Sequence, residues 1–214
     1  MRPRRILPER HLFVTEGTKT EPYYLNGMIE RICQCVGENA RQQFRIVGDG
    51  NCTLNLLKKA EQYQRNDSDG FQHVWLLYDK DDFPADAFDN TESRCKALNK
   101  RYQDEKRDLT FHAIWSNQCI ELWFLLHYSY LQADVSREEY REKLAKYIGR
   151  RYEKNDDHIF QTLSPHLDDA IKNSKNLMDS YSSKLSPAQK APCTNFHELI
   201  KFFNEKNYFK LSPL

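Results

Sequence analysis

The first 130 residues alternate short apolar runs with segments in which apolar residues recur at helical spacing. The apolar runs predict strands at residues 11–15, 44–47, 74–78 and 111–115. The periodic segments predict helices at residues 21–36, 53–65, 86–106 and 119–128. The run at 74–78 is apolar throughout, which is typical of a strand covered on both faces. This alternation predicts a parallel sheet flanked by helices.

Residues 131–214 carry helical patterns only, over 136–148, 165–181 and 195–206. Ser136 with Glu139 and Asn195 with Glu198 have the spacing of N-terminal helix caps. We therefore expect an α/β domain over residues 1–130 and a C-terminal helical annex over residues 131–214 that packs on it.

Composition narrows the classes of protein that fit. The chain has 214 residues with 32 Lys and Arg against 31 Asp and Glu, which excludes a polybasic tail binder that relies on bulk charge. The longest apolar run, Leu122 to Leu126, is far too short to span a membrane. The N-terminal residues show no secretory signal, and a P-loop lysine motif is absent. The cysteine spacing indicates no zinc site and favours a reducing, cytoplasmic location.

Acidic residues follow two of the predicted strands. Glu16 ends the first strand, and Asp79 and Asp81 follow the third. The carboxyl ends of parallel strands meet at one edge of a sheet, where ligands bind in open α/β folds. In an extended segment Asp79 and Asp81 point the same way, with Cα atoms about 7 Å apart. Such carboxylates hold hard cations such as Mg²⁺. The alternative is that this pair is only a turn and cap signal.

The loop after Glu16 has its own candidate features. Gly17 permits a sharp turn from strand to helix, Thr20 is a candidate N-cap, and Lys19 is placed to meet a phosphate. Glu21 is either an additional acid of the site or a first-turn acid favoured by the helix dipole.

The helix predicted at 119–128 is apolar on all sides, so it is expected to be buried. Ser116 or Asn117 is the expected cap of this helix. Glu121 in such a setting needs a partner or a metal ion, and it is a candidate extra ligand or supporting acid. The alternative is a hydrogen-bonded structural glutamate. Cys119 and His127 are expected to be structural.

Two basic segments are candidate contacts for nucleic acid. Arg2, Arg4 and Arg5 form a possible arm on phosphates. A second segment interleaves cations with Tyr147 and Tyr152, a pattern that grips backbones and stacks bases; its cations are Lys143, Lys146, Arg150, Arg151 and Lys154. The alternative for this segment is a solvated helix face.

Four motifs together resemble the RloB-like family of small bacterial proteins associated with restriction loci and phage defence. The motifs are Glu16-Gly17-x-x-Thr20-Glu21-Pro22-x-Tyr24, Asp79-x-Asp81, Ser116 to His127, and Thr194-x-x-His197-x-Leu199-Ile200. Gln118 and Ile120 depart from the usual residues of the third motif, at positions that do not include the acids. The family is related to the TOPRIM fold of topoisomerases, primases and OLD-type nucleases.

The resemblance implies a TOPRIM-like α/β fold and a metal-dependent nuclease acting on DNA or RNA in antiphage defence. In that reading Glu16 is a general acid/base or metal ligand, Asp79 and Asp81 hold Mg²⁺ or Mn²⁺, and Asp82 is a weaker addition. The expected partners are nucleic acid and other proteins of a defence locus. The alternative is a non-catalytic sensor that binds a nucleotide or nucleic acid at the same acidic edge. Nucleotidyl or phosphoryl transfer to a small molecule is a further alternative.

Overall fold

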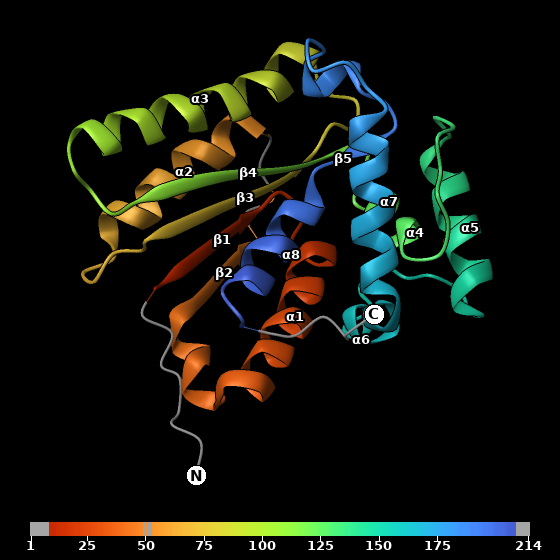
Figure 1. Cartoon of the computed structure of the whole chain (residues 1–214), viewed down its shortest axis with the longest axis horizontal. Helices are drawn as coiled ribbons and strands as arrows, with labels where there is room; N and C mark the ends of the chain where they lie inside the picture. Colours follow the sequence, from red (N-terminus) through yellow and green to blue (C-terminus); the bar gives the residue numbers. More distant parts are fainter. Residues whose placement is uncertain (1–8, 49, 51–52, 209–214) are drawn as a thin grey trace.

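The computed structural model describes residues 9–48, 50 and 53–208, apart from the side chains of residues 53 and 54. Within these residues the chain forms a five-stranded, mostly parallel sheet flanked by helices (Figure 1). This architecture agrees with the predicted α/β class and is consistent with a TOPRIM-like fold. Arg2, Arg4 and Arg5 lie outside the described residues.

The strand order in the sheet is β2-β1-β3-β4-β5. The first four strands are parallel and β5 runs antiparallel to β4. The strands are β1 (His11–Thr15), β2 (Phe44–Gly48), β3 (His73–Asp79), β4 (Thr110–Asn117) and β5 (Cys193–Thr194). The four predicted strands are therefore confirmed. The two-residue β5 was not predicted because it is too short to give a pattern.

Eight α-helices and three short 3-10 turns connect the strands within the described residues. The helices are α1 (Thr20–Val36), α2 (Thr53–Asn66), α3 (Ala85–Asp104), α4 (Glu121–Leu126), α5 (Arg137–Ile148), α6 (Ile159–Leu163), α7 (Leu167–Asp179) and α8 (Phe196–Glu205). The 3-10 turns are η1 (Glu38–Gln43), η2 (Ser164–His166) and η3 (Pro187–Gln189). All seven predicted helices are present, with α4 shorter than expected, and the five-residue α6 was missed. None of the helices in this part of the chain has the length and apolar content to cross a bilayer.

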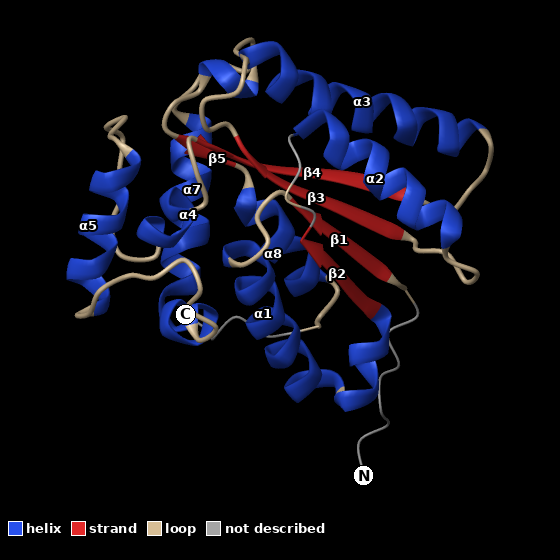
Figure 2. Cartoon of the chain, turned by 180° about the vertical axis from the view of Figure 1, so that it is seen from behind, coloured by secondary structure: helices blue, strands red, loops and turns tan. Residues whose placement is uncertain are grey.

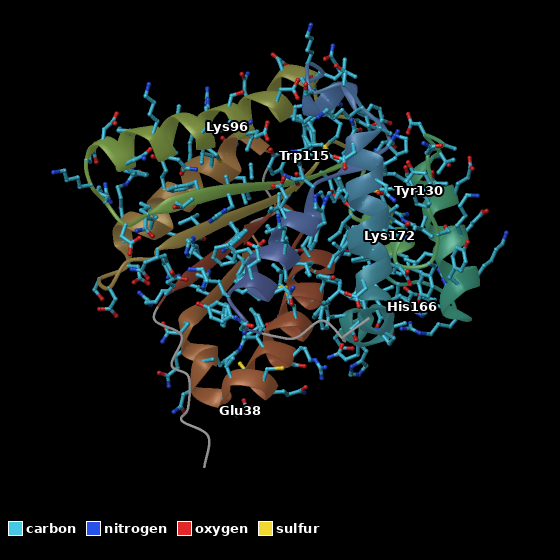
Figure 3. All side chains as sticks on the ribbon, in the orientation of Figure 1. Glu38, Lys96, Trp115, Tyr130, His166 and Lys172 are labelled. Atoms are coloured by element: carbon cyan, nitrogen blue, oxygen red, sulfur yellow. The ribbon has the colours of Figure 1, made fainter. Side chains whose placement is uncertain are left out.

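Helices cover both faces of the sheet. Figures 1 and 2 show α2 and α3 on one face and α1 and α8 on the other. Successive side chains of the strands point to opposite faces. The apolar cluster under α2 and α3 contains Leu12, Val14, Val74 and Leu76. The cluster under α1 and α8 contains Phe13, Trp75, Leu77 and Ile114. The central residues of β3 are buried on both faces, as the continuous apolar run predicted. Polar and charged side chains project from the outer sides of the helices (Figure 3).

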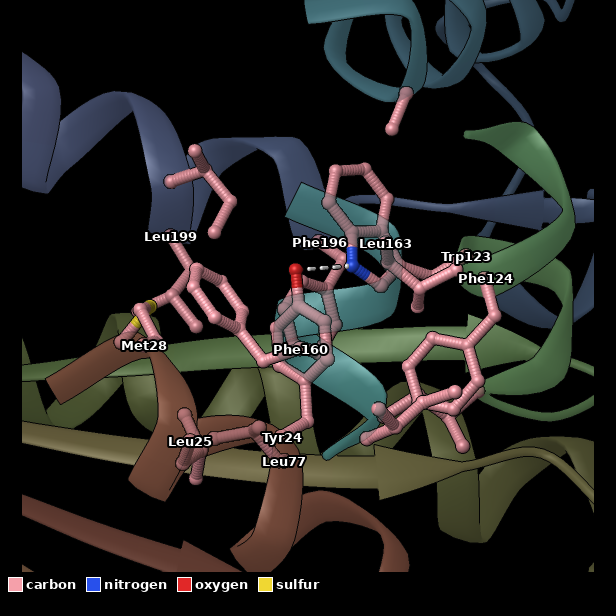
Figure 4. Close-up of a cluster of buried hydrophobic side chains, with 14 of the residues drawn as sticks. Tyr24, Leu25, Met28, Leu77, Trp123, Phe124, Phe160, Leu163, Phe196 and Leu199 are labelled. Carbon is pink, nitrogen blue, oxygen red and sulfur yellow. Dashed lines mark hydrogen bonds between the residues drawn. The ribbon is translucent and has the colours of Figure 1, made fainter. Parts of the chain in front are cut away.

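The annex shares its core with the α/β layers. Tyr24 of α1, Trp123 of α4 and Phe196 of α8 lie in one cluster, where the indole Nε1 of Trp123 donates a hydrogen bond to the Tyr24 hydroxyl at 3.0 Å (Figure 4). Aromatic stacking at such centroid distances, 5.1 Å for Trp123 and Phe196, adds to the area that they bury. In Figure 1, α5 and α7 lie beyond the carboxyl ends of the strands, whereas α8 packs on one face of the sheet. Residues after 130 also supply β5.

The two predicted caps of the annex helices have different outcomes. Ser136 caps α5, because its hydroxyl accepts a hydrogen bond from the N–H of Glu139. Asn195 precedes α8, but its side chain does not cap it. Instead its amide accepts from the N–H of Trp115 at 2.7 Å and donates to the carbonyl of Ala113 at 2.8 Å. Backbone groups of β4 therefore bind the side chain that the sequence pattern predicts to cap α8.

The side chain of Asn99 in α3 also forms hydrogen bonds with the backbone of β4. Its amide accepts from the N–H of Phe111 at 2.7 Å and donates to the carbonyl of Phe111 at 2.8 Å. Two asparagine side chains therefore satisfy the part of β4 that β5 does not pair. This arrangement closes a strand edge that would otherwise be open to another strand.

Candidate acidic site at the carboxyl ends of the strands

The carboxyl ends of β1 and β3 form one wall of a cleft of about 380 Å³. Parallel pairing aligns Thr15 of β1 with Leu77 of β3, so the residues that follow them are neighbours. The carboxylate of Glu16 accepts a hydrogen bond from the N–H of Asp79 at 3.3 Å. The cleft is lined by five acids and two lysines: Glu16, Glu21, Asp79, Asp81, Glu121, Lys19 and Lys154. The structure thus brings Glu16, Asp79 and Asp81 together.

Asp79 connects β3 to α4. Its Oδ2 accepts a hydrogen bond from the N–H of Ile120, the residue before α4, at 3.1 Å. Burial raises the pKa of Asp79 well above its ordinary value, and the nearby Glu21 and Glu121 raise it further. A buried carboxyl in this position is costly as an anion unless a cation or more donors approach it.

The expected cap of α4 at Ser116 or Asn117 is wrong. Both residues belong to β4. The Ser116 hydroxyl bonds to that of Thr194 at 3.0 Å, and the Asn117 amide donates to the carbonyl of Pro187 at 3.2 Å. The carboxylate that accepts a hydrogen bond at the start of α4 belongs to Asp79 of β3. No local sequence pattern reveals this contact.

Asp81 is not in an extended segment. The prediction that its side chain points the same way as that of Asp79, as in a strand, is therefore wrong. The chain turns after Asp79, and Asp81 has a φ of 41° in the left-handed region that asparagine and aspartate tolerate best. Its N–H donates to the carbonyl of Gln118 at 3.0 Å. Asp81 nevertheless lines the cleft. Burial raises its pKa, while the positive charge of Arg137 opposes the rise.

Arg137 at the start of α5 pairs with this segment. Its Nη1 lies 3.0 Å from Oδ1 of Asp81, and its Nη2 contacts the carboxylate of Asp82. The side chain of Asp82 is 93% exposed and does not line the cleft. The weaker candidate Asp82 therefore lies outside the acidic cleft and faces solvent.

Glu21 is a buried acid in the first turn of α1. Burial raises its pKa, with Glu121 contributing in the same direction. A Cβ on Gly17 would lie 2.0 Å from Oε2 of Glu21. The structure gives a different reason for this glycine than the predicted sharp turn: Gly17 leaves room for the carboxylate of Glu21.

The start of α1 also differs from the prediction. Thr20 is the first helical residue and Lys19 occupies the cap position. The hydroxyl of Thr20 donates to the backbone carbonyl of Lys154 at 3.0 Å, which joins this turn to the annex. Lys19 lines the cleft with an exposed side chain, where it can meet an anion.

Glu121 is 2% exposed and lines the cleft. Within the described residues its Oε1 has no hydrogen-bond partner. Its charge partner is Arg141 of α5, with 3.6 Å between Nε and Oε1. The structure thus supplies the partner that a buried glutamate needs, and this ion pair is compatible with both the ligand and the structural interpretation of Glu121. A carboxylate oxygen buried this deeply without a hydrogen bond is the kind of group that a ligand or ion satisfies.

Glu16 stands out among the cleft acids by its titration. Burial raises its pKa from 4.5 to about 7, with the nearby Asp81 and Glu21 adding to the rise and the hydrogen bond from Asp79 opposing it. A carboxyl group with this pKa exchanges its proton near neutral pH, which suits general acid/base chemistry.

The donors of the cleft fit a hard divalent cation. All five acids offer carboxylate oxygens, the preferred ligands of Mg²⁺. Two lysines oppose five acids, and the pKa values of four of these acids are raised, first by burial and then by the neighbouring carboxylates. Among the residues that the structure describes, no three acidic, histidine or cysteine side chains are arranged as metal ligands. Asp81 and Glu121 point to Arg137 and Arg141 instead.

The basic segment predicted near residues 143–154 is divided by the fold. Arg150 pairs with Asp156, and Arg151 lies 3.2 Å from Glu153. Lys146 is exposed on α5, away from the cleft. Tyr147 stacks on Tyr128 with ring centroids 5.1 Å apart, and Tyr152 is buried. Only Lys154 of this segment reaches the cleft.

The sequence interpretation did not identify Arg137 and Arg141 as part of the site. Both belong to α5 and are four positions apart, so they lie on one face of that helix. That spacing is a signal in the sequence, but the acids that the two arginines meet are at positions 81 and 121.

Cys119 and His127 have surroundings typical of structural residues. Both are buried, and burial raises the pKa of the Cys119 thiol. Burial lowers the pKa of His127 to about 3, and its Nδ1 bonds to the backbone carbonyl of Trp123 at 3.0 Å.

Comparison with protein families finds a match to the family model described as RloB-like protein, over residues 11–203. This range contains every residue of the acidic cleft. Comparison with curated proteins and with solved structures found no match.

Proposed function

The chain belongs to the RloB-like family, and from this premise we propose that it is a metal-dependent nuclease that hydrolyses phosphodiester bonds. The observation that supports this most is the convergence of Glu16, Asp79 and Asp81 in one cleft from two separate strands. Acids gathered where their pKa values are shifted are candidates for catalysis.

Asp79 and Asp81, with Glu16 beside them, are the residues that would hold Mg²⁺ or Mn²⁺. Such an ion supplies a positive charge that stabilises charge on phosphate oxygens. Glu121 is the next donor, because its Oε1 has no hydrogen-bond partner within the described residues.

The remaining steps rest on the side chains of the chain itself. Glu16 has a pKa of about 7, so near neutral pH it can accept a proton from water or return one to a leaving oxygen. Lys19 and Lys154 at the cleft attract the phosphate and offset part of the acidic charge. The protein atoms that enclose the Asp79 carboxylate have a lower dielectric constant than water, which strengthens each of these interactions.

Incubation of the purified chain with single-stranded DNA, double-stranded DNA and tRNA, with and without Mg²⁺ or Mn²⁺, tests this proposal. We expect substrate loss only with metal, and none from the double variant Asp79→Asn, Asp81→Asn. The matched control is Asp168→Asn with Asp169→Asn on α7, which removes the same charge away from the cleft. Cleavage by the Asp79/Asp81 variant would refute the site, and no cleavage of any substrate would refute the activity.

A non-catalytic sensor is the second candidate. It is favoured by the arginine contacts of the cleft, because Arg137 and Arg141 already neutralise Asp81 and Glu121. Binding of a nucleotide or nucleic acid without turnover, with or without metal, would support the sensor.

We also propose that the protein acts in the cytoplasm in antiphage defence, with other proteins of the same locus. A plating assay tests this role. Cells that express the locus should restrict phage, and the Asp79→Asn, Asp81→Asn variant should not. Equal restriction by both would contradict a defence role for the cleft.

A further inference from the structure

We propose that a second hollow beside the acidic cleft binds a phosphate of the same nucleic-acid strand, next to the phosphate that is hydrolysed. This inference rests on the proposed nuclease function, because it names how that site would hold its substrate. The hollow has a volume of about 430 Å³ and lies between α5 and the segment that follows it. Its lining residues are Arg141, Glu142, Ala145, Arg151, Tyr152, Glu153, Lys154 and Asn155.

Lys154 lines both the hollow and the cleft, so the two are neighbours. Its backbone is fixed by the hydrogen bond from the Thr20 hydroxyl at 3.0 Å. Arg141 provides a second connection, because it lines the hollow and pairs with Glu121 of the cleft at 3.6 Å. A strand with one phosphate in the cleft therefore has cations beside its next phosphate.

The hollow presents hydrogen-bond donors that lack protein partners. Within the described part of the chain, the side chains of Lys154 and Asn155 make no hydrogen bond or ion pair, and the charge of Lys154 acts on Glu21 and Asp81 of the cleft only at longer range. Arg141 has five N–H donors but only its ion pair with Glu121, and its Nε has no hydrogen-bond partner among the described atoms. A phosphate accepts several such bonds at once and matches the planar guanidinium group.

The charge of the hollow favours an anion more than that of the cleft does. Three cations, of which Arg141 also pairs with Glu121 of the cleft, oppose two acids in the hollow, whereas two lysines oppose five acids in the cleft. One of the two acids, Glu153, pairs with Arg151 at 3.2 Å, but the side chains are 54% and 89% exposed. Such an exposed pair contributes little, so a phosphate displaces Glu153 at low cost.

The same residues indicate which feature of the strand is recognised. Tyr152 is 8% exposed and Tyr147 stacks on Tyr128, so neither offers an open ring face to a base at the hollow. The donors instead suit the sugar-phosphate backbone, which carries no sequence information. The cleft and the hollow both have the volume of small-molecule sites, which admits one strand rather than a duplex. We infer a single-stranded stretch bound without base preference.

The test measures binding rather than cleavage. The protein carries Asp79→Asn and Asp81→Asn in a buffer with EDTA, so that the probe is not hydrolysed and two repelling charges are removed. Fluorescence anisotropy then gives the Kd for a short, labelled, mixed-sequence single-stranded RNA or DNA at several salt concentrations. Arg151→Gln with Lys154→Gln should raise the Kd about tenfold and reduce the salt slope by about 1.4, as expected for two lost phosphate contacts on a single strand.

The matched control is Lys143→Gln with Lys146→Gln, which removes the same charge from α5 at positions that do not line the hollow. We expect this pair to change the Kd less than twofold. An equal loss in both pairs, no binding by the parent protein, or equal affinity for a duplex of the same sequence would overturn the proposal. Each variant is compared by circular dichroism, so that a misfolded one is replaced by Arg151→Gln alone, which lines the hollow but not the cleft, with Lys146→Gln as its control.

Binding and cleavage separate this inference from the proposed function. Hollow-dependent binding by a chain that never cleaves nucleic acid would leave the phosphate subsite standing and refute the nuclease. Metal-dependent cleavage with unchanged Kd and KM in the Arg151/Lys154 variant would leave the nuclease standing and refute the subsite.

Discussion

The carboxylate of Glu16 accepts a hydrogen bond from the N–H of Asp79 at 3.3 Å, although 63 positions separate the two residues. The parallel pairing of β1 with β3 is what brings them together. Around this contact stand Glu21, Asp81 and Glu121, so the cleft concentrates negative charge in a partly buried place. The proposed chemistry follows from that concentration.

The contact between Arg137 and Asp81 predicts a competition with divalent cations. Arg137→Gln frees the carboxylate of Asp81, so we expect Mg²⁺ or Mn²⁺ to bind several-fold more tightly in calorimetric titrations. The free energy of unfolding should fall by at most about 1 kcal/mol, because the pair is partly exposed. Lys201→Gln, which breaks the exposed pair with Glu205 at 3.6 Å, is the control and should leave metal affinity unchanged. Weaker metal binding in Arg137→Gln would contradict this reading of the pair.

The pKa of Glu16 predicts how stability depends on pH. Burial raises this pKa from 4.5 to about 7, so between these values the folded protein binds more protons than the unfolded chain. Stability from this group is present below about pH 4.5 and is lost as pH rises through 7. Glu16→Gln removes the effect. The free energy of unfolding of the variant, relative to that of the metal-free wild type, should therefore be higher at pH 8 than at pH 5 by on the order of 1–3 kcal/mol. Urea unfolding at the two pH values measures this, and a constant difference would show that the pKa of Glu16 is not raised.

The approach of Glu21 to Gly17 predicts a specific coupling. Gly17→Ala places a Cβ where Oε2 of Glu21 now lies, and the buried carboxylate has little room to move. We expect the variant to lose about 1–3 kcal/mol of stability, as in other overpacked sites. In the background of Glu21→Ala the same change should be nearly neutral. A double-mutant cycle by chemical denaturation measures the coupling, and additive losses would mean that Gly17 serves another purpose.

The side chain of Asn195 predicts a large loss of stability when it is removed. Asn195→Ala leaves the buried N–H of Trp115 and the carbonyl of Ala113 without their side-chain partner. The expected loss is about 2–3 kcal/mol, since unsatisfied buried groups keep their full desolvation cost. If the alanine variant unfolds at the same urea concentration as the wild type, the strand edge does not depend on this residue.

The larger elements of the fold could be predicted from local patterns, and the exceptions have physical causes. The continuous apolar run of β3 needs burial on both faces, which only the centre of a covered sheet provides. By contrast β5 and α6 are too short for periodicity to reveal them. Asn195 and Thr20 are residue types that commonly cap helices. Their side chains instead bind backbone groups of β4 and of Lys154, respectively. Such competition depends on distant segments and is invisible in the sequence.

The candidate site shows the same division. The predicted parallel sheet placed Glu16 and Asp79 at a common edge. That they are direct neighbours depends on the pairing of β1 with β3, which the sequence did not predict. The geometry of Asp81 was not predictable, since its left-handed backbone depends on the turn after β3. The partners Arg137 and Arg141 come from a helix of the annex, and their contacts arise only when that annex packs against the cleft.

Glu16, Asp79 and Asp81 are proposed to form one cation site together. Crystals soaked in Mn²⁺, with anomalous diffraction recorded at the manganese absorption edge, test it most directly. We expect an anomalous peak bounded by these three carboxylates, with Arg137 moved away from Asp81. A map from crystals in saturating Mn²⁺ with no peak at this cleft would contradict it.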